Sequence, residues 1–402
     1  MYLTKEEERA LDGEYGYSIA LAMKILVALG EAFNAQRLIP ITSAHISGIS
    51  YVNIGEEGIS FLEKISSIAK VKVHTTINPA AFDLDKWRSM NIPQDIMERQ
   101  LKIIKLFEKI GVTCSLTCTP YLTCNKPKMG EHIAWGESSA VTFVNTVLGS
   151  MTNREGGPSA LASALTGKTP FYGLHLREER MPTAEVLINN MPRGSTWYSL
   201  LGYYIGLVLK QGIPFIKNIP RAVSVEELKS FSAGLAAASN ISMAIIEGIT
   251  PKGTYEEPKD SLEKIHVDVN DLKEIKEKYS ANLDSRDIEL VFLGCPHYSL
   301  KELEEVVNLL KGKRIKKDTR VWIAISRDIY NEALTKGYIR IIEQSGAKVI
   351  RDTCAVVAPL RQIGVRNVVT DSAKAMHYLR LRHRANVMLS SSSEVLRASL
   401  TY

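Results

Sequence analysis

Residues 111–159 read GVTCSLTCTPYLTCNKPKMGEHIAWGESSAVTFVNTVLGSMTNREGGPS, and this segment sets the expectations for the rest of the chain. It holds three of the five cysteines, and glutamate, serine, asparagine and arginine side chains follow them between Glu137 and Arg154. Soft metal ligands and small polar groups crowd into one segment here, whereas a core segment would be mainly apolar. This composition indicates an active site.

The residues just before this segment predict how one of its cysteines is placed. The sequence PQDIMERQLKIIKLFEKI at 93–110 has helical spacing of apolar residues, with proline in the first turn and Gly111 at its end. Residues 112–116 then predict a short β-strand. We therefore expect Cys118 to follow the C-terminal end of a strand.

The second half of the chain predicts a parallel β-sheet. Strand segments at 288–294, 320–326 and 347–351 alternate with helical segments at 300–310 and 328–345. Strands that alternate with helices form parallel sheets with right-handed crossovers. The fold class is therefore α/β.

A change in composition near Pro220 predicts a domain boundary. We expect residues 1–222 to form an N-terminal α/β region that carries the central segment, and 223–359 to form a second α/β domain with βαβ order. The last stretch, 360–402, is expected to return and complete the N-terminal region.

Cys118, Cys295 and Cys354 each come directly after a predicted strand. Ligands bind at the carboxyl edge of parallel sheets, so these three cysteines are the candidate metal ligands. Thiolates suit both zinc and iron–sulfur clusters, but structural zinc sites usually contain the C-x-x-C spacing that this trio lacks. Cys114 and Cys124 lie close enough in sequence to compete with Cys118 for the ligand role.

Composition limits the other functions. The chain has 402 residues, 45% of them hydrophobic and 23% charged, with a formal net charge of +6. No apolar run reaches the roughly 18 residues that a membrane span needs, and the first residues predict a helix capped by Thr4 and Glu7 rather than a signal peptide. The basic run at 311–317 has no interleaved aromatic residues, which argues against nucleic-acid binding. Five widely spaced cysteines are typical of a reducing cytoplasm.

Five short motifs together resemble the large subunit of the aconitase X family. They are CTPY at 118–121, WGESSAV at 135–141, VNTVLGSMTNREGG at 144–157, GCPH at 294–297 and DTC at 352–354. The resemblance implies an aconitase-like multi-domain architecture with parallel βαβ sheets around an iron–sulfur site. It also implies a hydro-lyase with a 4Fe-4S cluster, one iron of which is open to substrate, and a separate small subunit whose swivelling domain supplies a serine base.

The resemblance further implies the substrate. The expected reaction removes water from (R)-mevalonate 5-phosphate and gives trans-anhydromevalonate 5-phosphate, in the mevalonate pathway of isoprenoid biosynthesis. The alternative substrate within the family is cis-3-hydroxy-L-proline, and the alternative of another class is an iron–sulfur redox-sensing binding protein. Arg154, Lys374, Lys126 and Lys128 outnumber Glu137 among the charged candidates, which favours the phosphorylated acid.

The candidate site residues lie at predicted loop and strand-end positions. Glu137 and Ser138 are the catalytic candidates, although Glu137 could instead cap a helix. The histidines His45, His74 and His297 could either transfer a proton or orient the structure. The candidates for binding substrate are Ser43, His45, Thr75, Thr76, Asn78, Asn145, Asn153, Arg154, Ser372 and Lys374.

Overall fold

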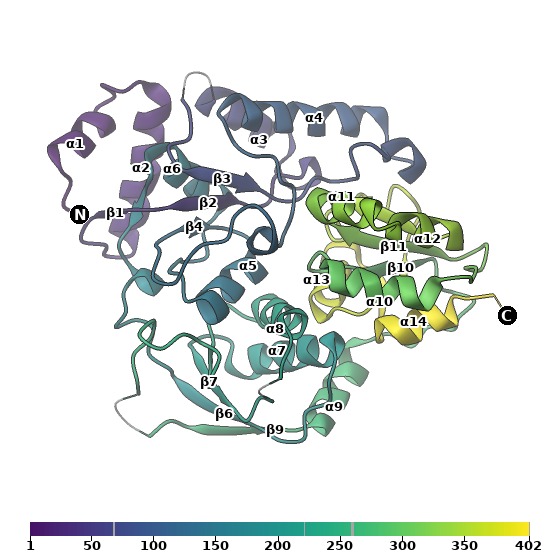
Figure 1. Ribbon diagram of the computed structural model, residues 1–402. Coiled ribbons are helices and arrows are strands. Elements are labelled where there is room, and N and C mark those ends of the chain that lie inside the picture. Colours follow the sequence, from purple (N-terminus) through teal and green to yellow (C-terminus); the bar gives the residue numbers. More distant parts are fainter. Residues whose placement is uncertain (67–68, 221, 259–260, 402) are drawn as a thin grey trace.

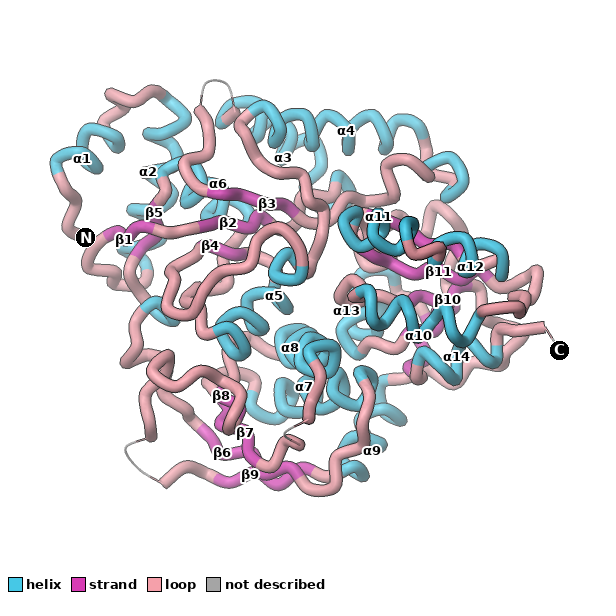
Figure 2. The backbone as a smooth tube through the Cα atoms, viewed as in Figure 1, coloured by secondary structure: helices cyan, strands magenta, loops and turns pink. Residues whose placement is uncertain are grey.

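A computed structural model describes residues 1–66, 69–220, 222–258 and 261–401. The chain forms three α/β domains, which Figure 1 shows in purple and blue, in teal, and in green and yellow. Figure 2 shows that the strands gather in separate groups within these domains. The expected α/β class with parallel sheets is confirmed.

The first domain surrounds a three-stranded parallel sheet in the order β3-β2-β4, and a small antiparallel pair, β1-β5, lies beside it. As predicted, Thr4 and Glu7 form a capping box at its first helix. Its elements are α1 Lys5–Leu11, α2 Tyr17–Ala32, β1 Leu38–Pro40, β2 Ser43–Ile46, α3 Tyr51–Ile65, β3 His74–Ile77, η1 Trp87–Met90, α4 Gln94–Lys109, η2 Pro120–Leu122, β4 Ala134–Trp135, α5 Ser138–Phe143, η3 Val144–Leu148, α6 Gly157–Thr166, β5 Lys168–Pro170 and η4 Gly173–His175.

The strand predicted at 112–116 is reduced to one bridge, between Thr113 and Thr76 of β3. Leu116, near the end of this segment, adopts a left-handed backbone with φ of 48°, which is incompatible with a regular strand. Cys118 nevertheless follows this extended segment, as expected.

The second domain carries a parallel sheet in the order β8-β7-β6-β9 and a pair of closely packed helices. Its elements are β6 Ala184–Ile188, α7 Ser195–Leu209, β7 Pro214–Lys217, α8 Val225–Ala238, β8 Ile245–Ile246, β9 Lys264–Val267 and α9 Val269–Tyr279. A Cβ atom on Gly234 would lie 2.0 Å from the Ser199 carbonyl oxygen, and one on Gly202 would lie 2.1 Å from that of Phe231. The two glycines therefore allow α7 and α8 to touch through their backbones.

The third domain contains a five-stranded parallel sheet in the order β12-β11-β10-β13-β14. Along β10, Leu290 and Phe292 face the large central core, while Val291 and Leu293 face a second core beneath the helices of the other side. The elements are β10 Leu290–Leu293, α10 Leu300–Leu310, β11 Arg320–Ile325, α11 Arg327–Thr335, α12 Tyr338–Ser345, β12 Lys348–Arg351, β13 Asn367–Thr370, α13 Ala373–His383, β14 Asn386–Leu389 and α14 Ser392–Ala398.

Two parts of the expected domain division differ from the structure. Residues 360–402 do not complete the N-terminal region, because β13 pairs with β10 and β14 pairs with β13 in the third sheet. The boundary at 222 also falls inside a domain, since β6, α7 and β7 before it pack with β9, α8 and β8 after it. The helix predicted at 328–345 is two helices, because Gly337, with φ of 75°, separates α11 from α12.

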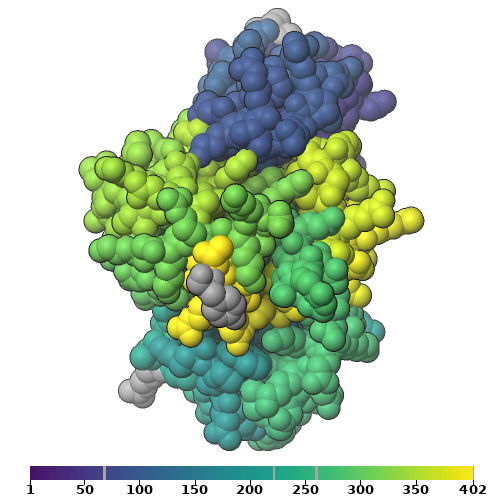
Figure 3. All heavy atoms as spheres, turned by 90° about the vertical axis from the view of Figure 1, so that its right-hand side faces the viewer, coloured from purple at the N-terminus to yellow at the C-terminus, as the bar shows by residue number. Residues whose placement is uncertain are grey.

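The three domains meet around α8, which contacts α5, α7 and α13. Figure 3 shows the third domain between the first domain above and the second domain below. Across the residues that the structure describes, no helix has both the length and the apolar content needed to cross a membrane.

Candidate functional site

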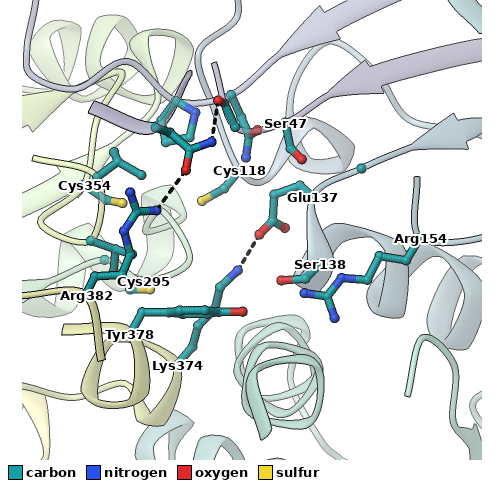
Figure 4. Close-up of a pocket in the computed structure, with 18 residues that line it drawn as sticks. Ser47, Cys118, Glu137, Ser138, Arg154, Cys295, Cys354, Lys374, Tyr378 and Arg382 are labelled. Carbon is teal, nitrogen blue, oxygen red and sulfur yellow. Dashed lines mark hydrogen bonds and ion pairs between the residues drawn. The ribbon is translucent and has the colours of Figure 1, made fainter. Parts of the chain in front are cut away.

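The candidate site is a pocket between the first and third domains, shown in Figure 4. Its volume is about 230 Å³, which suits a small metabolite better than a nucleotide. The first domain contributes Ser47, Gly48, Asn53, Asn78, Pro79, Cys118, Gly136, Glu137, Ser138 and Arg154, and the third domain contributes Gly294, Cys295, Cys354, Val356, Val357, Lys374, Tyr378 and Arg382.

The three cysteines predicted as ligands all line this pocket. Cys295 follows β10 and Cys354 follows β12, so both leave the carboxyl edge of the third sheet. Cys118 reaches the same place from the first domain. Each thiol is free and buried, with an exposed fraction of 8 or 9%.

A left-handed residue comes shortly before each cysteine. Leu116 and Asp352 have φ of 48° and 62°, and each lies two positions before its cysteine. Non-glycine residues held in this region cost of order 1–3 kcal/mol each and concentrate at functional sites. The third such residue is Gly294, where a Cβ atom would lie 2.2 Å from the Ala324 carbonyl oxygen. The fold therefore bends the chain at this cost at Leu116 and Asp352, whereas Gly294 adopts its φ of 96° without it.

The thiols need a cation to become ligands. Burial raises the pKa of Cys118, Cys295 and Cys354 to about 12, although Lys374 acts in the opposite direction. Within the described part of the chain, no three Cys, His, Asp or Glu side chains come close enough to hold one metal ion. Thiols that share a pocket at wider spacing fit a polynuclear cluster, in which each sulfur binds a different metal atom.

Glu137 and Lys374 form an ion pair across the domain boundary, with side chains that are 7% and 10% exposed. The Glu137 carboxylate also accepts hydrogen bonds from the Ser139 hydroxyl and the Ala140 N–H, both at 2.7 Å. Burial alone would raise the pKa of Glu137, but Lys374 and these donors outweigh it and hold the pKa at about 2. Glu137 is therefore an ionised group that both caps α5 and lines the pocket.

Two arginines lie at the exposed rim, on opposite sides of the pocket (Figure 4). Arg154 donates a hydrogen bond from Nη1 to the Ala236 carbonyl oxygen at 3.3 Å, and Arg382 donates one to Asn53 Oδ1 at 3.3 Å. Each guanidinium keeps further donors, which could bind a carboxylate or phosphate. The pocket thus combines a thiol-lined interior with a cationic rim.

Sequence reasoning missed four polar residues of the pocket, namely Ser47, Asn53, Tyr378 and Arg382. Ser47 and Asn53 follow β2, so they could have been found by extending the predicted loop at Ser43 and His45 by a few positions. Tyr378 and Arg382 lie one and two helical turns beyond Lys374 on α13. The i, i+4 spacing from Lys374 is the signal that could have identified them.

Of the predicted substrate-binding residues, Asn78, Arg154 and Lys374 line the pocket, and the predicted catalytic pair Glu137 and Ser138 does so as well. The other seven substrate candidates are not part of the lining: Ser43, His45, Thr75, Thr76, Asn145, Asn153 and Ser372.

The side chains outside the pocket hold the surrounding segments instead. His45 Nδ1 lies 2.7 Å from Thr76 Oγ1, and Ser43 Oγ accepts from Trp135 Nε1 at 3.2 Å. Ser372 caps α13. The remaining three donate side-chain hydrogen bonds to backbone carbonyls, from Thr75 to Val73, from Asn145 to Thr152, and from Asn153 to Tyr172.

Comparison with protein families finds matches along nearly the whole chain. Residues 1–178, 182–277 and 288–401 match the profiles described as the aconitase X first, second and third domains. These ranges follow the three domains of the structure.

Several relatives match over nearly their full length. The phosphomevalonate dehydratase large subunit of Methanocaldococcus jannaschii is 44% identical over 99% of this chain and 100% of that protein. The protein of the same name from Thermococcus kodakarensis is 44% identical over 94% of this chain and 95% of that protein. The cis-3-hydroxy-L-proline dehydratase of Pseudomonas aeruginosa is 33% identical over 92% of this chain but only 65% of that protein. The crystal structure of Thermococcus kodakaraensis aconitase X in its holo form superimposes with a TM-score of 0.92, at 42% identity, and covers 99% of this chain and 100% of that one.

Proposed function

Because this chain belongs to the aconitase X family, we propose that it is the large subunit of a phosphomevalonate dehydratase. The reaction is the removal of water from (R)-mevalonate 5-phosphate to give trans-anhydromevalonate 5-phosphate. The observation that carries this assignment is identity of 37–44% to five archaeal phosphomevalonate dehydratase large subunits, over 94% or more of this chain. The hydroxyproline dehydratases reach only 30–33%.

The charges around the pocket agree with a substrate that has an acidic group at each end. Phosphomevalonate carries a carboxylate and a phosphate, and each charge-assisted hydrogen bond contributes about 1.5–3 kcal/mol. Arg154 and Arg382 lie on opposite sides of the pocket, so one can bind each acidic end. Lys374 is already neutralised by Glu137, and the net charge left for the substrate is therefore that of the arginines.

Cys118, Cys295 and Cys354 would hold an iron–sulfur cluster of the 4Fe-4S type. Three thiolates leave one iron without a protein ligand, and when bound such a cluster supplies a Lewis acid that draws off the substrate hydroxyl. The buried position of the three thiols keeps water away from this part of the pocket.

The pocket offers no clear base for taking the substrate proton. Among the lining residues that the structure describes there is no histidine, and the one carboxylate, Glu137, is held ionised by Lys374 and Ser139. With a pKa of about 2, Glu137 is a poor proton acceptor at neutral pH. We therefore assign the base to a small partner subunit with a swivelling domain, which would cover the pocket and complete the active site.

The test is to prepare the chain anaerobically with and without the proposed small subunit. The chain alone should carry iron and sulfide but turn over almost no substrate, and mixing should restore activity. Full activity of the isolated chain would contradict this division. Turnover of cis-3-hydroxy-L-proline with none of phosphomevalonate would refute the substrate.

Cysteine variants test the cofactor separately. Cys118→Ala, Cys295→Ala and Cys354→Ala should each lose most of the iron. Cys114→Ala is the matched control, because Cys114 packs against the core of the first domain rather than the pocket. Stoichiometric zinc without sulfide in the wild-type protein would refute the cluster.

A further inference from the structure

His297 lies where all three domains meet, behind the cysteine-lined part of the pocket. Its side chain is fully buried. Its ring contacts the first domain through Thr117 Oγ1, 3.1 Å from Nδ1, and a loop of the third domain through the Thr353 carbonyl oxygen, 2.9 Å from Nε2. Its own carbonyl accepts a hydrogen bond from Lys229 Nζ of the second domain at 2.9 Å.

These contacts fix the direction of every hydrogen bond around the ring. The Thr353 carbonyl can only accept, so Nε2 carries the proton, and in a neutral imidazole Nδ1 must then accept. The ring is fully buried, which favours its neutral form. Thr117 therefore donates its hydroxyl proton to Nδ1, and its oxygen accepts from the Thr119 N–H at 3.1 Å.

His297 and the two residues that bond to its ring are close neighbours of the three cysteines in the sequence. Thr117 precedes Cys118, Thr353 precedes Cys354, and His297 itself follows Cys295 by two positions. In addition, the His297 N–H donates to Cys118 Sγ at 3.3 Å. One residue thus joins three cysteine segments that are far apart in sequence.

We infer that His297 is a positioning residue, which holds the three cysteine segments at the separation that the cofactor requires before the cofactor is bound. This inference rests on the proposed cofactor site. Both ring nitrogens bond to the protein, and His297 is not among the lining residues of the pocket, so its ring is not placed to exchange a proton with substrate.

The first test needs no cofactor. In the cofactor-free protein, alkylation of Cys118 and Cys354 should be slow in the wild type, because both thiols are buried. His297→Leu removes the hydrogen bonds from the ring to Thr117 and Thr353, so these segments should open more often, and alkylation should rise about tenfold. Cys114, outside the pocket, reports global unfolding, and its rate should stay unchanged.

The second test measures iron retention after reconstitution. His297→Leu should release iron to a chelator about tenfold faster than the wild type, for the same reason. His297→Gln keeps a donor that can reach Thr353, and His297→Asn keeps an acceptor near Thr117, so both should fall between the wild type and His297→Leu. The control is His175→Leu, another buried histidine, whose ring bonds to His132 and not to a cysteine segment.

The outcomes separate the inference from the proposed function. Wild-type alkylation rates and iron retention in His297→Leu would overturn the role of His297. Equal iron loss in His175→Leu would also overturn it, because the loss of any buried histidine would then be enough to release iron. A wild-type chain that takes up no iron would refute the cofactor instead, while the alkylation rates would still decide whether His297 holds the segments.

Discussion

The ion pair between Glu137 and Lys374 gives the sharpest energetic prediction. Both side chains are at most 10% exposed, so solvent screens the pair little. Lys374→Met removes the ammonium but leaves the Glu137 carboxylate with its Ser139 and Ala140 donors. Removing one partner of a buried pair costs about 3–5 kcal/mol, because the other charge stays buried without compensation.

The double variant tests whether this cost comes from the unpaired charge. Glu137→Gln alone should also cost about 3 kcal/mol or more, since it leaves the ammonium buried. Glu137→Gln together with Lys374→Met removes both charges, and it should cost less than the sum of the single variants by about 3 kcal/mol. The free energy of unfolding is measured by urea titration of the cofactor-free chain, followed by tryptophan fluorescence.

A solvent-accessible pair provides the control. Lys217 and Glu185 lie 2.9 Å apart with side chains that are 30% and 16% exposed, and Lys217→Met should cost no more than about 1 kcal/mol. The reasoning would be refuted if the double variant lost as much unfolding free energy as the two single variants at Glu137 and Lys374 added together, within about 0.5 kcal/mol.

Three further predictions concern Glu137, Gly234 and Arg382. Because Lys374 and its companions depress the pKa of Glu137 from 4.5 to about 2, this carboxylate adds stability above pH 4.5 that is lost as the pH falls toward 2; the urea midpoints of wild type and Glu137→Gln should therefore converge between pH 6 and pH 2.5, and a constant gap would contradict it. Gly234→Ala should destabilise the chain by about 1–3 kcal/mol or more in urea unfolding, because the new Cβ would lie 2.0 Å from the Ser199 carbonyl oxygen; an unchanged midpoint would show that α7 and α8 can separate freely. Arg382→Ala should raise KM for phosphomevalonate about tenfold or more, while the melting temperature stays unchanged, since this side chain is exposed and donates its hydrogen bond to Asn53 at the pocket rim; an unchanged KM would remove Arg382 from substrate binding.

The sequence was most informative where a cysteine or a short polar motif follows the end of a predicted strand. Cys295 and Cys354 follow strands that alternate with helices along the chain, and the parallel sheet brings its carboxyl ends to one edge. Arg154 and Glu137 were found because they stand beside glycines and serines in a segment of unusual composition. Local sequence was enough to predict that these residues lie at one pocket, while their roles stay predictions.

The rest depended on contacts between distant segments. Nothing local says that β13 pairs with β10 rather than with the first domain, since parallel partners need not be neighbours in sequence. The polar side chains of Ser43, His45 and Thr76 resembled site residues, but strands bury alternate side chains, and here they bond to one another or to Trp135. Arg382 carries no motif, and only the packing of α13 brings it to the pocket.

The placement of Cys118 also has a consequence for biosynthesis. Its sulfur accepts a hydrogen bond from His297, a residue 179 positions later in the chain. At about 5–20 residues per second, the ribosome needs roughly 10–40 s to add those residues. During that interval the first domain can fold, but Cys295 and Cys354, which share the pocket with Cys118, have not yet been synthesised. If the three cysteines hold the proposed cluster, its assembly must therefore follow translation of the third domain. A nascent or prematurely ended chain would expose the Cys118 thiol to oxidation before the other two ligands exist.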